Sequence, residues 1–364
     1  MKNFIMVLFL ICFFGQGFAQ NKKQSKEWKL FQELMEKEHI PGLAYAVVKD
    51  GTVISQGTMG YASLPFKAKV TPATAFQLAS CSKIYCSLLM GRLFDMGLLK
   101  PDQSIGDFID SIPTAWKEIT VLQLAAHQSG IQIADFSTAK TSADAVSLAK
   151  SMPMQFTPGS QSAYVSSDYW ILLNIIERVT GQKYYEALKK YVLEPLQIKH
   201  TFVSNLNLGF TNSMDIIPEQ AQEYHWFGED STIRITTMNF TAIDYAAGGV
   251  YSSIEDLAIV AQCFDKGSFI SPATQKLISN GVLLKNGKPG SFGLGLVVND
   301  NYEGHKLIEH SGGPALADFV RFDNERYTFI VLTNNRGTYP YLAKALATLY
   351  ISGLSFPKVP EDWK

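Results

Sequence analysis

Strand-like patterns lie at both ends of this 364-residue chain, and most of the middle is predicted to be helical. Near the start, the apolar run 43–48 leads to Asp50-Gly51, a pair that favours the turn of a hairpin, and 52–56 is expected to return as a strand. Further short strands are predicted beyond Gly290, over 292–298, 306–310, 318–322 and 327–332. The sequence therefore predicts an α+β fold, in which an antiparallel sheet from both ends is flanked by helices and an all-helical region is inserted.

Apolar residues spaced three and four apart predict the helices. They are expected over 28–35, 80–99, 169–180, 184–192 and 341–351. Gly181 and Pro195 are typical stop signals for two of them. We expect one domain over 20–364, with an α/β part at about 20–79 and 235–364 and a helical part at about 80–234.

The first 19 residues have the features of a secretory signal peptide. Lys2 precedes an 11-residue apolar run, 4–14, and small residues at 17 and 19 favour cleavage after Ala19. An anchoring helix is the alternative, but this run is too short to span a bilayer comfortably. We expect an exported protein, periplasmic or secreted, with no stable membrane span after cleavage.

Composition narrows the classes of partner. The chain has 32 basic and 33 acidic residues, so its formal charge of −1 predicts no nucleic-acid binding. No His and Cys cluster has zinc-site spacing, and no cofactor is expected. The mature chain would keep Cys81, Cys86 and Cys263, too few for a disulfide-built scaffold.

The pattern Ser-x-x-Lys occurs four times, so by itself it carries little information. The pairs are Ser80/Lys83, Ser137/Lys140, Ser147/Lys150 and Ser355/Lys358. Only the first opens a strongly apolar helix, where residues i and i+3 share a face and the lysine can lie over the serine hydroxyl. Such a lysine can activate the serine as a nucleophile if burial or charge lowers its pKa. A capping serine beside a solvated lysine is the structural alternative.

Two later segments favour the catalytic interpretation. Tyr164-x-Ser166 stands before a predicted helix and His310-x-Gly312 stands at a predicted strand end, whereas the other Tyr-x-Ser pairs, Tyr61/Ser63 and Tyr251/Ser253, lack that helix-entry context. In this order the motifs resemble those of the serine β-lactamase and penicillin-binding protein superfamily, most closely its class C, D-aminopeptidase and carboxylesterase branch. The resemblance covers nearly all of the mature chain.

The resemblance implies an acyl-enzyme mechanism. Ser80 would attack a carbonyl carbon, with Lys83 and Tyr164 exchanging the proton. Backbone N–H groups of Ser80 and Gly313 would bind the oxyanion. The substrate-binding residues that it implies are Ser166, His310, Ser311 and Gly312.

Two residues depart from the usual pattern of the superfamily. Ser166 replaces an asparagine, and a hydroxyl cannot donate and accept as an amide does. His310 replaces the lysine of β-lactamases, so a fixed cation for a substrate carboxylate is absent. We expect a serine hydrolase acting on a small-molecule or peptide ester or amide, of peptide, D-amino acid or lactam type.

The alternatives are an acyltransferase that passes the acyl group to an alcohol or amine, an efficient β-lactamase, and a non-catalytic binding protein. The last two are less favoured. His127, in a His-x-Ser-Gly block, is expected to be structural. The sequence does not predict the oligomeric state.

Overall fold

The computed structural model describes residues 25–132, 139–203, 206–207, 213–238, 240–313 and 316–361; the predicted signal peptide lies outside them. The α-helices of the described part are α1 (Lys26–Lys37), α2 (Lys83–Asp95), α3 (Val121–Ala125), α4 (Ser142–Lys150), α5 (Ser167–Thr180), α6 (Tyr184–Leu188), α7 (Ile254–Lys266), α8 (Pro272–Ser279) and α9 (Leu342–Ala347). Its strands are β1 (Gly42–Lys49), β2 (Thr52–Ser63), β3 (Ala68–Lys69), β4 (Phe76–Gln77), β5 (Thr201–Val203), β6 (Leu206–Asn207), β7 (Ser213–Met214), β8 (Tyr224–Phe227), β9 (Thr232–Ile235), β10 (Val250–Ser252), β11 (Val297–Tyr302), β12 (His305–Gly312), β13 (Ala317–Phe322) and β14 (Tyr327–Thr333).

The main sheet joins the two ends of the chain. Its seven strands within the described residues run in the order β11-β12-β13-β14-β1-β2-β3. All pairs are antiparallel, and β1 meets β14 from Leu43 opposite Thr333 to Lys49 opposite Tyr327. The structure thus confirms the predicted α+β fold with a central antiparallel sheet.

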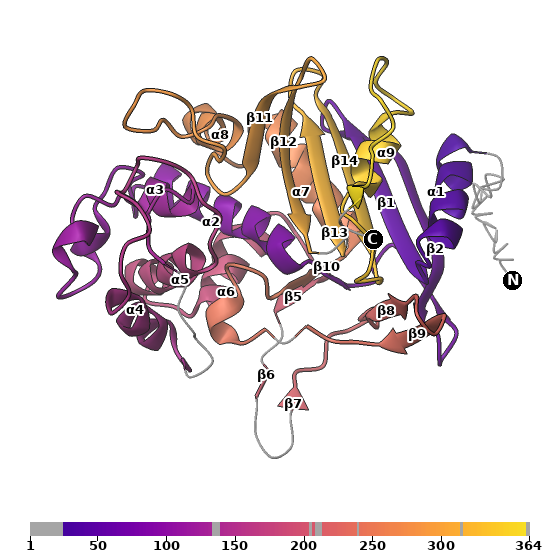
Figure 1. Ribbon diagram of the computed structural model, residues 1–364, viewed down its shortest axis with the longest axis horizontal. Helices are drawn as coiled ribbons and strands as arrows, with labels where there is room; N and C mark the ends of the chain where they lie inside the picture. Colours follow the sequence, from indigo (N-terminus) through magenta and orange to yellow (C-terminus); the bar gives the residue numbers. More distant parts are fainter. Residues whose placement is uncertain are drawn as a thin grey trace, which may run out of the picture.

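Strand β1 shows how the sheet separates two apolar layers. Its odd-numbered residues 43–47 pack in one cluster with residues of α1 and α9, while the even-numbered 44–48 pack in another with α2 and α7. Successive side chains of a strand point to opposite faces, so a fully apolar run is buried on both sides. Figure 1 shows α2 to α6 gathered beside the sheet on the side of β11 and β12, and α1 near β2 at the opposite side.

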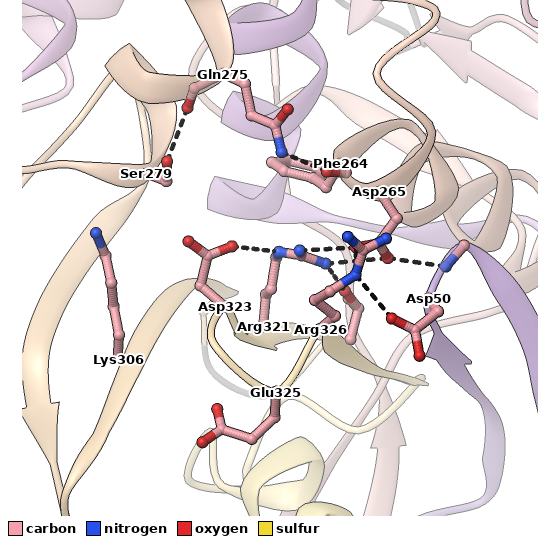
Figure 2. Close-up of polar contacts among 12 residues, drawn as sticks. Asp50, Phe264, Asp265, Gln275, Ser279, Lys306, Arg321, Asp323, Glu325 and Arg326 are labelled. Carbon is pink, nitrogen blue, oxygen red and sulfur yellow. Dashed lines mark hydrogen bonds and ion pairs between the residues drawn. The ribbon is translucent and has the colours of Figure 1, made fainter. Parts of the chain in front are cut away.

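An ion-pair cluster around the buried Arg321 and Asp265 ties α7 to one end of the sheet (Figure 2). The Arg321 guanidinium contacts both carboxylate oxygens of Asp265, at 2.9 and 3.2 Å, and its Nε lies 2.9 Å from Asp323. The Asp265 carboxylate also accepts the Gly51 backbone N–H at 3.0 Å. Arg326 adds a 2.7 Å contact to Asp50 of the β1–β2 hairpin. In β13, Arg321 lies at the opposite end from Ala317, the residue that pairs with Gly312.

Four predicted elements differ in extent or geometry. The strand predicted over 292–298 begins only at Val297, because Gly295 has a φ of +85° and a Cβ there would lie 2.0 Å from the Ser87 hydroxyl. The helix predicted over 80–99 is a 3₁₀ turn, Ala79–Ser82, followed by α2. The final helix is shorter than the predicted 341–351, and the helix predicted over 184–192 turns from α into π geometry after Leu188.

Candidate active site

Ser80 lies in the 3₁₀ turn that leads into α2. The turn is held on both sides: the Ala79 N–H donates to Gln77 Oε1 at 2.5 Å, and the Val250 N–H donates to the Ser82 hydroxyl at 3.0 Å. Ala79 has a φ of +45°, a left-handed conformation that costs an L-residue free energy. The surrounding hydrogen bonds therefore fix Ser80 in a position that the local sequence alone would not favour.

Lys83 is the first residue of α2, and its side chain is fully buried. Its Nζ donates to the Tyr164 hydroxyl and to the Ala247 carbonyl oxygen, both at 2.8 Å. The rings of Tyr164 and Tyr169 each have their centroid 4.9 Å from this Nζ. A buried ammonium is tolerated because two oxygens and two aromatic rings replace its water shell.

Tyr164 completes a hydrogen-bonded chain to the serine. Its hydroxyl donates to Ser80 Oγ at 2.8 Å and accepts from Lys83. Tyr164 is 47% exposed, so the serine end of this hydrogen-bonded series faces solvent. The sequence-predicted Ser80, Lys83 and Tyr164 are thus brought together by elements more than 80 residues apart.

The end of β12 lies against the turn that carries Ser80. A Cβ on Gly312 would lie 1.8 Å from the Leu78 carbonyl oxygen, whereas one on Gly313 would meet nothing within 4 Å. The Cys81 thiol donates to the His310 carbonyl at 2.7 Å, a contact that sequence analysis missed. Glycine at 312 therefore permits the close backbone approach that an oxyanion hole between Ser80 and Gly313 requires.

His310 presents a neutral imidazole. Its Nδ1 lies 2.9 Å from the Ser311 carbonyl oxygen, which can only accept, so Nδ1 carries the proton and Nε2 is bare. Burial, together with the nearby Lys83 ammonium, lowers the pKa of His310 to about 3. The position where β-lactamases have a cation is therefore uncharged at neutral pH.

The other expected substrate-binding residues are placed differently from one another. The Ser311 hydroxyl donates to Asp318 at 2.8 Å, and the same carboxylate accepts the Ala343 N–H of α9 at 3.0 Å. Because side chains alternate along β12, Ser311 points to the α9 face, away from the face of His310. Ser166 is the N-cap of α5 and is partly exposed, and its hydroxyl makes no hydrogen bond with the described residues.

Sequence analysis also missed a buried polar pair beside Tyr164. His127 Nδ1 lies 3.2 Å from Asp168 Oδ2, and the His127 ring centroid is 4.6 Å from that of Tyr164. Asp168 lies in the first turn of α5, four residues after Tyr164. An acidic residue within a helix that is otherwise buried is the signal that could have identified it.

The described residues contain no group of three or more His, Cys, Asp or Glu side chains placed to bind a metal ion. That no metal or cofactor is needed stays a prediction. No helix of the described part is long and apolar enough to cross a membrane.

Comparison with known proteins places the chain in a family. Residues 29–351 match the family described as beta-lactamase. A protein named beta-lactamase from Escherichia coli (strain K12) is 28% identical over 230 residues, which cover 62% of this chain but only 56% of that protein. Penicillin-binding protein 4* of Bacillus subtilis (strain 168) is 25% identical over 372 residues, which cover 95% of this chain and 80% of the relative.

Solved structures show the same fold. The octameric penicillin-binding protein homologue from Pyrococcus abyssi superposes with a TM-score of 0.74 at 24% identity, covering 89% of this chain and 76% of that one. EstCE1, described as a hydrolase with promiscuous acyltransferase activity, superposes with a TM-score of 0.73 at 17% identity, covering 88% of this chain and 96% of that one. The chain therefore belongs to the beta-lactamase family, within the serine β-lactamase and penicillin-binding protein superfamily.

Proposed function

We propose that this protein is a serine hydrolase that cleaves an ester or amide through an acyl-enzyme on Ser80. The observation that carries the proposal is the hydrogen-bonded chain from the buried Lys83 through Tyr164 to Ser80, with 2.8 Å at each step. Such a chain gives the serine hydroxyl a base within reach, which nucleophilic catalysis requires. The membership in the beta-lactamase family supports it.

The geometry supports a two-step reaction. In the reactive form Tyr164 has lost its phenol proton to solvent, and the adjacent Lys83 ammonium stabilises the phenolate. The phenolate takes the proton of Ser80 as Oγ attacks the substrate carbonyl carbon. The tetrahedral oxyanion would be bound by the N–H groups of Ser80 and Gly313. When the carbonyl re-forms, the leaving group departs with the proton from Tyr164. In the second step Tyr164 takes a proton from water as the water oxygen attacks the acyl carbon. Tyr164 then returns the proton to Ser80 Oγ as the acid is released.

His310 favours substrates without a carboxylate at its position. A neutral imidazole offers no fixed positive charge, so a β-lactam or other carboxylate substrate gains no ion pair there. A second cation, Arg336, lies 3.9 Å from the buried Glu223 carboxyl group. We therefore place uncharged esters and amides ahead of β-lactams.

Acyl transfer is the second candidate, because EstCE1 shares the fold and is described as having acyltransferase activity. The exposed Tyr164 hydroxyl would allow an alcohol or amine, as well as water, to reach the acyl-enzyme.

Export through cleavage after Ala19 is also part of the proposal, and N-terminal sequencing of the protein recovered outside the cytoplasm tests it. An N-terminus other than Gln20 would refute that cleavage site.

The deciding experiment is intact-mass detection of acyl-enzyme over a panel of aryl esters, D-amino acid amides and β-lactams. We expect adducts with the uncharged esters, and loss of every adduct in Ser80→Ala. Ser147→Ala is the matched control, because Ser147 begins another Ser-x-x-Lys and lies exposed on α4. Persistent labelling of Ser80→Ala would refute the nucleophile. An added alcohol that yields a new ester in place of free acid would assign acyl transfer.

A further inference from the structure

His127 holds the chain on both sides of Tyr164. Its backbone carbonyl accepts the Ala163 N–H at 2.8 Å, and its Nδ1 accepts the Val165 N–H at 3.4 Å. Between these two contacts, the imidazole lies against the Tyr164 ring, with 4.6 Å between centroids. One residue thus fixes the backbone before and after Tyr164 and supports its ring.

His127 adopts a backbone conformation that is unfavourable for histidine. Its φ is +54°, in the left-handed region, and the residue is only 1% exposed. A non-glycine residue keeps this conformation only where the surrounding structure determines it, as happens at functional sites. The left-handed backbone of His127 directs both its carbonyl and its ring to the segment 163–165.

Asp168 joins His127 to α5. Its Oδ2 lies 3.2 Å from His127 Nδ1, and its Oδ1 accepts the Ser129 hydroxyl at 2.5 Å. Because Nδ1 already accepts the Val165 N–H, it carries no proton, so the contact with Asp168 requires a proton on the carboxyl.

The electrostatics of the pair agree with this assignment. Burial raises the pKa of Asp168 well above its usual range, against the opposing effects of Ser129 and Lys83. Burial, with the charges of Lys83 and His310, lowers the pKa of His127 well below its usual range. Burial therefore favours the uncharged form of each group.

We propose that His127 is a positioning residue that holds the Tyr164 hydroxyl between Ser80 and Lys83, and that Asp168 orients His127 by donating a hydrogen bond to its Nδ1. The proposal rests on the proposed function, since it assigns these residues to the proton exchange of that reaction. Neither side chain touches the reacting atoms, so their effect is on the rate of acylation rather than on substrate binding.

Asparagine variants test the geometry. His127→Asn tolerates the left-handed backbone and places Oδ1 where Nδ1 was, so it still accepts from Val165. Asp168→Asn still donates to Nδ1 and still accepts from Ser129. We expect both to keep kcat within about threefold of the wild type, whereas His127→Ala and Asp168→Ala lose at least roughly tenfold in kcat with KM within about twofold.

His39 provides the matched control. It too is a histidine with positive φ, +53°, and its ring stacks on Trp226 at 3.8 Å, but it lies between α1 and β1. His39→Ala therefore reports the effect of relieving the same backbone strain and losing an aromatic contact elsewhere. We expect its kcat to stay within twofold of the wild type.

The outcomes separate the hypotheses. Rates are measured with an aryl ester and expressed per folded molecule, so that a loss of stability is not read as a loss of turnover. A kcat within threefold of the wild type in the alanine variants of His127 and Asp168 would overturn the proposal. So would a loss of kcat in the asparagine variants as large as that in the alanine variants. If His127→Ala does not fold, the Asp168 pair of variants decides. A wild type that forms no acyl-enzyme would refute the proposed function instead.

Discussion

Removal of the Tyr164 hydroxyl is the most direct perturbation of the proposed reaction. Tyr164→Phe keeps the ring and its packing against His127 and Phe292, whose centroids lie 4.6 and 6.2 Å away. It deletes the oxygen that bonds to both Lys83 and Ser80 at 2.8 Å. Any change in rate is therefore due to the loss of one atom.

The magnitude follows from what that oxygen does. A positioned acid and base contributes about 10²–10⁴ in rate, so we expect kcat to fall at least ~10²-fold, or about 2.7 kcal/mol in activation free energy. The free energy of unfolding should fall by only about 1 to 2 kcal/mol, because the buried Lys83 ammonium loses one acceptor but keeps the Ala247 carbonyl. The protein stays folded while turnover falls.

The assay is steady-state turnover of a chromogenic ester at saturation, with intact mass to follow the acyl-enzyme. Tyr61→Phe is the matched control, because Tyr61 also starts a Tyr-x-Ser pair and has a lysine, Lys69, with its Nζ 3.6 Å from the ring centroid. We expect the control to retain kcat within twofold. A Tyr164→Phe enzyme within threefold of the wild type would refute the role of this hydroxyl as the base.

Three further predictions concern other parts of the molecule. Gly312→Ala should abolish acylation and destabilise the fold by about 1–3 kcal/mol, because the new Cβ would lie 1.8 Å from the Leu78 carbonyl oxygen and backbone atoms must move. Normal labelling of this variant by a fluorophosphonate would contradict the prediction. Asp265→Ala should lower the free energy of unfolding in urea by about 3 kcal/mol, because it removes the bidentate partner of the buried Arg321, while kcat per folded molecule stays unchanged; an unaltered urea midpoint would show that the pair contributes little. Burial raises the pKa of Glu223 from 4.5 to about 7, so between these pH values the folded state keeps a proton that the unfolded state releases. The free energy of unfolding should therefore fall by on the order of 3 kcal/mol from pH 4.5 to 7. Glu223→Gln should lack this fall, and equal pH profiles of the two proteins would refute the assignment.

The parts of the fold that sequence predicts well are determined locally. The hairpin at Asp50-Gly51 needs only a turn pair between two strand patterns, and the end of α5 needs only Gly181, which adopts a φ of +64°. The joining of both ends of the chain in one sheet was predicted because the strand patterns recognised in the sequence lie near those ends. The short strands β5 to β9 lie in or at the end of the part predicted to be all-helical, and that part of the prediction was wrong.

Elements shaped by distant contacts were harder to predict. The apolar run from Phe292 resembles a strand, but Gly295 adopts positive φ where the chain passes Ser87, more than 200 residues earlier. The turn at Ser80 is 3₁₀ rather than α because residues from β10 and β12 hold it from outside. Such contacts leave no periodic signal in the local sequence.

The candidate site divides in the same way. Ser80, Lys83 and Tyr164 were identified because their motifs occur in a fixed order, although their contacts cross the fold. The pairing of His127 with Asp168 was not predicted, because it joins residues 41 positions apart with no motif between them. The orientation of Ser311 was predictable in principle, since alternation along β12 puts it opposite His310 and Gly312.

The pairing of β1 with β14 also sets the order in which the molecule can assemble. The Gly42 N–H donates to Asn334 Oδ1 at 2.8 Å across 292 residues of sequence, so β1 pairs with a strand that is synthesised much later than itself. Closing so long a loop makes this a late and slow step of folding. Until it occurs, β1 has an unpaired edge, and β12, which carries His310 and Gly312, is paired with β11 and β13 but not yet joined to β1 and β2. A product truncated before β14 would therefore be both inactive and prone to aggregate.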